Sequence, residues 1–197
     1  MININVNDVI EKICDSELIT KQINMLKTLE ISTKILEINN IEYWLGYGTL
    51  IGCLRHGGFI PWDDDIDICI LKSNLENLLS IKSNEILIKK LHEQLYRISH
   101  NGWEIDVFVL PENHEENIEM MMSEIFPLKI SKFNGIKCFI PNNPTNFFKR
   151  KYGNLNPISH CLVWNHKIND MWSDGFEMKK IKIKFKDLDK KWKKYKI

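Results

Sequence analysis

Apolar residues recur along this chain at two periods, which predict helices in some segments and strands in others. In residues 7–38 isoleucine and leucine return near helical spacing, with no Gly or Pro between them, so a long helix is expected. Residues 41–45 form a short aromatic and apolar run that predicts a buried strand. Gly46 ends this strand, and residues 49–56 are expected to form a short helix that Thr49 caps.

Two turn signals predict hairpins in the middle of the chain. Asn101-Gly102 and Asn134-Gly135 each lie between two short apolar runs, and Asn-Gly suits a two-residue hairpin turn because both residues accept positive φ angles. The expected strands besides 41–45 are 66–71, 95–99, 103–110, 128–130, 136–140 and 180–185. Residues 75–91 are expected to be mixed helix and turn, and further short helices are expected at 118–125, 144–152 and 187–195.

The expected elements include both helices and strands, which indicates the α+β class. The sequence has 197 residues and shows no internal repeat or low-complexity linker, so a single domain over residues 1–197 is expected. Within it we distinguish an N-terminal helical segment (1–40), a catalytic core (41–157) and a basic C-terminal segment (176–197).

Charge is spread unevenly, although the net charge is only +1. The C-terminal segment 176–197 contains ten lysines and three acidic residues, so the remainder of the chain is acidic. A basic tail on an acidic body favours an anionic partner, with residues 190–196 as the expected docking segment. The alternative is a solvated lysine-rich surface in a sequence that is rich in Asn, Ile and Lys throughout.

Targeting signals and cysteine usage narrow the setting. The N-terminus has neither a basic start nor an apolar stretch, and no apolar run of about eighteen residues occurs, so neither a secretory signal nor a transmembrane segment is expected. Five cysteines are scattered along the chain without a C-x-x-C pair. Their number and spacing indicate a reducing compartment, so a cytoplasmic location is expected.

The strongest chemical signal is a group of carboxylates at the entrance of an expected strand. Four of them lie within five residues, namely Asp63, Asp64, Asp65 and Asp67. Such carboxylates repel one another and resist burial, and a bound cation removes that penalty. Asp65 and Asp67 are two residues apart and therefore point to the same side of a strand. Asp63 and Asp64 are consistent with simple turn residues.

A further carboxylate interrupts an apolar strand downstream. Asp106 lies in the middle of residues 103–109, where a lone aspartate is costly unless it is paired or bound to a metal. Glu104 shares its face and is the reserve ligand. Carboxylate oxygens are suited to Mg²⁺ or Mn²⁺, so we expect Asp65, Asp67 and Asp106 to hold catalytic metal ions.

The arrangement resembles a known fold and a known family. A Gly-Thr pair after one strand, Asp-x-Asp at a second and a single Asp on a third are similar to the nucleotidyltransferase (polymerase-β-like) fold, a small mixed sheet flanked by helices. Residues 48–55 (GTLIGCLR) and 58–67 (GFIPWDDDID) resemble the LicD family more narrowly. That family includes bacterial phosphocholine transferases and fukutin-related ribitol-phosphate transferases. Weaker similarity continues to about residue 157, where Lys151 stands at a position that is more usually arginine.

The resemblance implies a transferase. The implied reaction moves a phospho-alcohol, such as phosphocholine or ribitol phosphate, from a CDP-linked donor to a hydroxyl of a glycan or lipid-linked sugar. Asp65, Asp67 and Asp106 would be catalytic as well as metal-binding. The candidate substrate- and phosphate-binding residues are Gly48, Thr49, Arg55, Lys149, Arg150 and Lys151.

Other interpretations of these residues stay open. Arg55 could instead hold the acidic loop, and residues 149–151 could be the solvated side of a helix. The same three aspartates would serve a nucleotidyltransferase that makes an NDP-activated compound from an NTP; release of CMP or of pyrophosphate separates the two reactions. A nucleic-acid-binding module is the alternative from another class, but it leaves the aspartates unexplained and lacks an aromatic–basic motif, so nucleic acid is not the expected partner.

Overall fold

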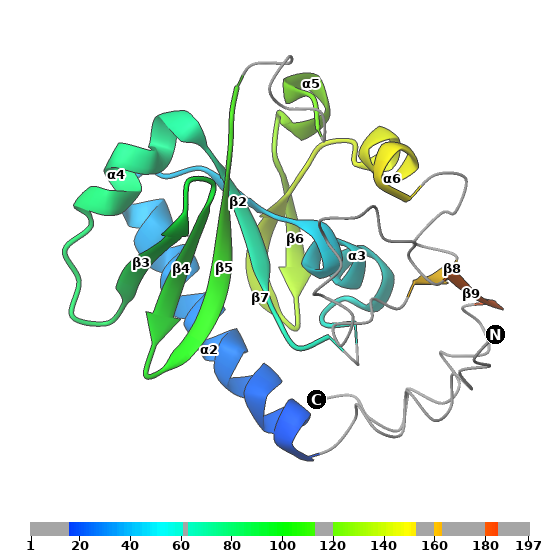
Figure 1. The fold of residues 1–197 in the computed structure, drawn as a ribbon, viewed down its shortest axis with the longest axis horizontal. Coiled ribbons are helices and arrows are strands. Elements are labelled where there is room, and N and C mark those ends of the chain that lie inside the picture. The colour runs from blue at the N-terminus through cyan, green and yellow to red at the C-terminus, as the bar shows by residue number, and fades with distance from the viewer. Residues whose placement is uncertain (1–15, 61–62, 113–119, 153–159, 163–179, 185–197) are drawn as a thin grey trace.

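The computed structural model describes residues 16–60, 63–112, 120–152, 160–162 and 180–184. In chain order the elements are α2 (Ser16–Ile38), β1 (Tyr43–Leu45), α3 (Tyr47–His56), β2 (Asp67–Leu71), a 3₁₀ turn (Lys72–Asn74), α4 (Leu75–Ser80), β3 (Leu87–His92), β4 (Leu95–His100), β5 (Trp103–Leu110), α5 (Met122–Ile125), β6 (Lys129–Phe133), β7 (Ile136–Ile140), α6 (Thr145–Tyr152), β8 (His160–Leu162) and β9 (Lys180–Lys184). A five-stranded sheet of order β1-β2-β5-β4-β3 forms the centre, with helices around it (Figure 1). The fold is therefore α+β, with a small mixed sheet flanked by helices, as expected.

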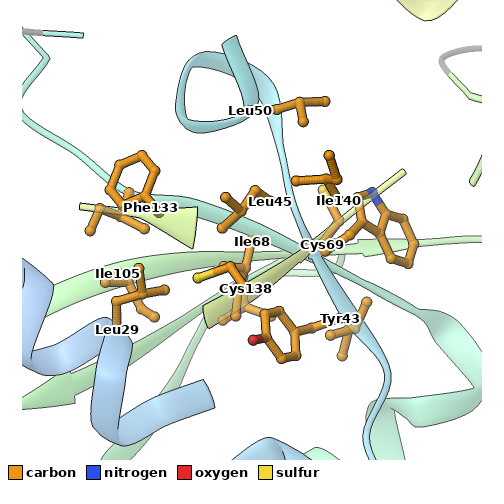
Figure 2. Close-up of a cluster of buried hydrophobic side chains, with 14 of the residues drawn as sticks. Leu29, Tyr43, Leu45, Leu50, Ile68, Cys69, Ile105, Phe133, Cys138 and Ile140 are labelled. Atoms are coloured by element: carbon orange, nitrogen blue, oxygen red, sulfur yellow. The ribbon is translucent and has the colours of Figure 1, made fainter. Parts of the chain in front are cut away.

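One face of the sheet is covered by the long helix α2. This helix contacts β5 and β4, and it buries Met25, Leu29 and Leu36 at helical spacing. Strand β5 alternates, so that Ile105, Val107 and Val109 are buried while the residues between them are not. Figure 2 shows Leu29 of α2 beside Ile105 of β5. Each such side chain contributes roughly 1.5–3 kcal/mol when it is fully buried, and this contact fixes which face of β5 is turned away from α2.

The two central strands are parallel neighbours. Asp67 of β2 lies opposite Asp106 of β5, and Cys69 lies opposite Phe108. Paired residues of neighbouring strands point to the same face, and Asp106 alternates with the residues that pack on α2. Both aspartates therefore lie on the face that α2 does not cover.

Two hairpins complete this arrangement, and both were predicted from their Asn-Gly pairs. Asn101 and Gly102 join β4 to β5 with φ angles of 50° and 83°, and Asn134 and Gly135 join β6 to β7 with φ angles of 46° and 88°. Positive φ at both central residues is the conformation that Asn-Gly favours. The β6–β7 hairpin packs on β1 and α3, next to the acidic end of the central sheet (Figure 1).

Two expectations about local structure are wrong. Residues 75–91 contain the edge strand β3 after α4; the strand is almost entirely exposed and includes Lys89 and Lys90, so it lacks the apolar alternation that marks a strand. Helix α3 begins at Tyr47, its N-cap is Gly46, and no side chain caps it. The expected cap, Thr49, therefore lies inside the first turn.

The remaining expectations are confirmed in part or lie outside the described residues. Helices α2, α5 and α6 and strand β9 fall within segments expected to be helical or extended, although α5 is shorter and β8, the partner of β9, was not expected. Residues 7–15, 187–195 and the docking segment 190–196 are not described. Cys53, Cys69 and Cys138 are buried free thiols. Among the helices of the described part, none combines the length and the apolar character that crossing a membrane requires.

Candidate active site

The segment that leads to the acidic cluster is fixed by the tip of the β6–β7 hairpin. The N–H of Asn134 donates to the carbonyl of Gly57 over 2.7 Å, and the N–H of Phe59 donates to Oδ1 of Asn134 over 3.0 Å. A Cβ atom on Gly58 would lie 1.9 Å from that Oδ1, so any other residue there would displace the Asn134 side chain. The turn therefore sets the path of the chain four residues before Asp63.

Asp67 is held at its backbone by the start of α3. Its N–H donates to Oγ1 of Thr49 over 2.8 Å, and its carbonyl accepts from the N–H of Gly46 over 3.0 Å. Thr49 is only 1% exposed. By accepting this hydrogen bond, the Thr49 hydroxyl fixes the entrance of β2.

The carboxylate of Asp67 is buried among other carboxylates. Asp67 as a residue is only 9% exposed, and its in-register neighbour on the sheet is Asp106. Burial first, and then the charges of Asp65, Asp63 and Asp106, raise the pKa of Asp67 well above its ordinary value. The structure thus brings the three predicted metal ligands to one edge of the sheet, where the charges of Asp65 and Asp106 oppose the ionisation of Asp67.

Asp63 belongs to this cluster, although it was interpreted as a turn residue. Its Oδ2 is buried and accepts no hydrogen bond within the described part of the chain. A Cβ atom on Gly48 would lie only 3.0 Å from this oxygen, so the glycine leaves room for the carboxylate. Burial, followed by the charge of Asp65, raises the pKa of Asp63 well above its ordinary value. The two-residue spacing of Asp63, Asp65 and Asp67 is visible in the sequence, but residues 63–65 precede β2, so the spacing alone did not show that Asp63 points inward.

Asp64 behaves as a surface residue, as expected. Its Oδ2 lies 2.9 Å from Nζ of Lys21, and both side chains are more than a third exposed. The alternation of Asp63, Asp64 and Asp65 therefore separates two carboxylates of the site from one that faces solvent.

Arg97 is a site residue that the sequence did not reveal. It lies opposite Asp106 in the antiparallel β4–β5 pair. Its Nε donates to Oδ1 of Asp106 over 2.6 Å, and its Nη1 donates to Glu104 over 2.9 Å. A single arginine in a polar strand carries no motif, and only the register of the sheet shows which carboxylates it meets.

The chemistry of this cluster fits a divalent cation. It offers carboxylate oxygens, including the buried Oδ2 of Asp63 without a hydrogen bond, and such ligands suit Mg²⁺ or Mn²⁺. Among the described residues no three Asp, Glu, His or Cys side chains are already grouped as a metal site, and Asp106 is bound to Arg97. Asp63, Asp65, Asp67 and Asp106 are the residues that could hold the ion.

The three predicted basic residues of α6 have three different surroundings. Lys151 places its Nζ 4.7 Å from the ring centre of Tyr47, and its charge lowers the pKa of Asp67, against the larger effect of burial. Arg150 instead forms a two-pronged ion pair with Glu124 of α5, and Lys149 is exposed. Among these three residues, Lys151 has the contact that places it beside the acidic site.

Arg55 and His56 close the end of α3. The Nε of Arg55 donates to Nε2 of His56 over 3.0 Å, and the charge of Arg55 acts on Asp63. Burial, followed by the charge of Arg55, lowers the pKa of His56 to about 3. The structure thus favours the alternative role of Arg55, which is to hold the acidic loop, and it keeps His56 neutral.

A mixed sheet with a parallel central pair, a short helix at the end of its first strand and aspartates at the shared edge defines a nucleotidyltransferase domain. The chain belongs to the LicD/FKTN/FKRP family, whose nucleotidyltransferase domain matches residues 40–143.

Curated relatives of this chain include named transferases, so the family is one of enzymes. The human ribitol 5-phosphate transferase FKRP is 27% identical over 143 residues, which cover 60% of this chain and 29% of that protein. The lipopolysaccharide cholinephosphotransferase LicD of Haemophilus influenzae is 41% identical over 61 residues, 31% of this chain and 23% of that protein. The chain spans about half, or less, of the length of the curated relatives it matches.

A solved structure with a similar fold is that of the antibiotic-resistance factor ANT(2'')-Ia. The TM-score is 0.48 at 13% identity, over 76% of this chain and 82% of that one.

Proposed function

We propose that this protein is a metal-dependent transferase that moves a phospho-alcohol from a CDP-linked donor to a hydroxyl of a glycan or lipid-linked sugar. The observation that carries the proposal is the pair Asp67 and Asp106, side by side on parallel strands and joined by Asp63 and Asp65. The names of two relatives, a ribitol 5-phosphate transferase and a cholinephosphotransferase, support the phospho-alcohol as the transferred group.

In this reaction the acceptor oxygen forms a bond to the phosphorus of the phospho-alcohol, the bond from that phosphorus to CMP breaks, and the hydroxyl proton is released. A bound Mg²⁺ or Mn²⁺ would neutralise the diphosphate and polarise the attacked phosphorus. The aspartates would hold the ion, and Thr49 and Gly46 fix Asp67 through its backbone. Lys151, above the ring of Tyr47, supplies a positive charge beside the same carboxylates.

The setting that we propose is cytoplasmic, where the buried thiols of Cys53, Cys69 and Cys138 stay reduced. Two of these thiols, Cys53 and Cys69, lie on the elements that position Asp67, namely α3 and β2.

The test is incubation with CDP-ribitol, CDP-choline or CDP-glycerol and Mg²⁺, with release of CMP as the readout and Asp67→Asn as the control. CMP release that depends on one donor and on Asp67 supports the proposal. Pyrophosphate release from an NTP and a phosphorylated alcohol would instead establish a nucleotidyltransferase, because the same carboxylates serve both reactions. No turnover of any donor in the presence of acceptor sugars and metal would contradict the proposal.

A further inference from the structure

A row of charged residues crosses the sheet on the face that α2 does not cover. Asp67 lies opposite Asp106, Asp106 lies opposite Arg97, and Arg97 lies opposite Lys89. Because opposite residues point to the same face, strands β2, β5, β4 and β3 carry two carboxylates followed by two basic side chains. The negative half of the row is the candidate metal site, and the positive half directly adjoins it.

Arg97 joins the two halves. Its Nε and Nη2 reach both carboxylate oxygens of Asp106, over 2.6 and 3.5 Å, and its Nη1 reaches Oε2 of Glu104 over 2.9 Å. The Arg97 side chain is 35% exposed and that of Glu104 is 46% exposed. The guanidinium can therefore leave Asp106 and remain bound to Glu104, which lies on β5 like Asp106.

We propose that Arg97 is an exchangeable counter-cation. In the metal-free protein it neutralises Asp106. When a divalent cation binds Asp106, the guanidinium of Arg97 leaves this carboxylate and binds the phosphate of the substrate. This inference rests on the proposed metal-dependent transfer. The metal ion and the guanidinium compete because both bind the oxygens of Asp106. The same planar fork that binds a carboxylate also matches a phosphate, so the displaced guanidinium has a new partner when the substrate arrives.

The first test measures the affinity for Mn²⁺ by the electron paramagnetic resonance of the free ion, in the absence of substrate. Arg97→Met is expected to bind Mn²⁺ about fivefold more tightly, which is the effect of removing one partly exposed competing ion pair. Arg97→Lys keeps the charge and should remain near the wild-type affinity. Lys21→Met is the matched control, because Lys21 pairs with Asp64 over 2.9 Å, outside the row. Its Mn²⁺ affinity should not change.

The second test measures the binding of inorganic pyrophosphate at saturating Mn²⁺ by calorimetry. Arg97→Met is expected to bind pyrophosphate several-fold more weakly, although it binds the metal more tightly. The two opposite signs are the signature of an exchange, because general damage to the site would weaken both affinities. Arg97→Gln serves as a second variant if Arg97→Met fails to fold, and it should move both affinities in the same directions.

The possible failures can be told apart. Mn²⁺ binding by Arg97→Met and Arg97→Gln that is equal to or weaker than that of wild type overturns the exchange and leaves the proposed metal site standing, provided that Asp67→Asn abolishes Mn²⁺ binding. Tighter Mn²⁺ binding with unchanged pyrophosphate binding also overturns it, because Arg97 would then compete with the metal without serving the phosphate. If Mn²⁺ binds none of these proteins, the metal site fails and the exchange fails with it.

Discussion

The two Asn-Gly hairpins have nearly the same turn and different surroundings. At the β4–β5 turn the side chain of Asn101 contacts only its neighbour His100 among the hydrogen bonds of the described residues, at an exposed end of the sheet. At the β6–β7 turn Asn134 binds Gly57 and Phe59, on the segment that leads to the acidic cluster. The local sequence therefore determines the turn in both cases, while tertiary packing alone decides whether a turn also positions the site.

We call the β6–β7 turn the docked turn, because it contacts the segment before the acidic cluster. Substitution of a carboxylate in that cluster has the largest expected effect on activity. Asp67→Asn should lower kcat/KM by more than about 100-fold, because the loss of charge stabilisation in a metal site usually costs several kcal/mol. Asp64→Asn is the matched control: its side chain pairs with Lys21 on the surface, and its activity should stay within a few-fold of wild type. CMP release from the CDP-linked donor is the readout.

Asp67→Asn should also raise the melting temperature of the metal-free protein at neutral pH. Burial and three neighbouring carboxylates oppose the charge of Asp67, and asparagine removes that charge with little change of shape. Activity of Asp67→Asn within about tenfold of wild type would contradict its role as a ligand.

Sequence reasoning predicted the parts of the site that follow from periodicity. Asp67 was predicted at the entrance of one apolar strand and Asp106 in the middle of another, and the parallel register shows that the two are neighbours. It gave no partner where that partner is distant in sequence. Arg150, a candidate phosphate ligand, forms an ion pair with Glu124 of another helix, which no local pattern indicates.

The fold shows the same division between local and tertiary information. Both hairpins were predicted from two residues each, whereas the edge strand β3 was missed because exposure on both faces leaves it without an apolar pattern. Asp63 was missed for a related reason. Aspartate is common in turns, and only the packing against Gly48 shows that this one points inward.

The next largest effect should come from Gly58, where the docked turn approaches the chain. Gly58→Ala places a Cβ atom 1.9 Å from Oδ1 and 2.4 Å from Cγ of Asn134, so the Asn134 side chain must move and lose its hydrogen bond to Phe59. We expect a loss of about 1–3 kcal/mol in the free energy of unfolding, as for other overpacked sites, together with reduced turnover. Denaturant titration measures the first and CMP release the second.

Asn134→Gly should recover part of the stability that Gly58→Ala loses. Asn134→Gly removes the side chain that the new Cβ meets, so Gly58→Ala with Asn134→Gly should be more stable than the sum of the two single effects predicts. Strict additivity of the two substitutions would show that Gly58 and Asn134 do not interact as the structure indicates.

A smaller effect separates the two turns directly. Asn134→Ala and Asn101→Ala both lose a residue that tolerates positive φ, and Asn134→Ala also loses the hydrogen bond to the N–H of Phe59. Asn134→Ala should therefore be the less stable variant, by about 1 kcal/mol for one hydrogen bond. It should also be the less active one. Equal losses of stability and activity in both variants would remove the distinction between a docked turn and a free one.

At neutral pH the smallest effect concerns His56, at the end of α3 beside the residues that Asn134 contacts, and this effect grows as the pH falls. Burial and Arg55 lower its pKa from 6.5 to about 3, so between these two values the unfolded chain binds a proton at His56 that the folded chain does not. Its contribution to stability is complete above about pH 6.5 and is lost as the pH falls toward 3. His56→Gln retains an oxygen that can accept from Arg55 but cannot be protonated in this range. The free energy of unfolding should therefore fall less steeply between pH 7 and about pH 4.5 in His56→Gln than in wild type, as measured by denaturant titration at each pH.

The other ionisable groups are the same in both proteins, so their contribution largely cancels in the difference. His92→Gln, which removes an exposed imidazole of β3, controls for the loss of a histidine as such. Parallel pH profiles for wild type and His56→Gln would show that the imidazole of His56 is as accessible to protons in the fold as in the unfolded chain.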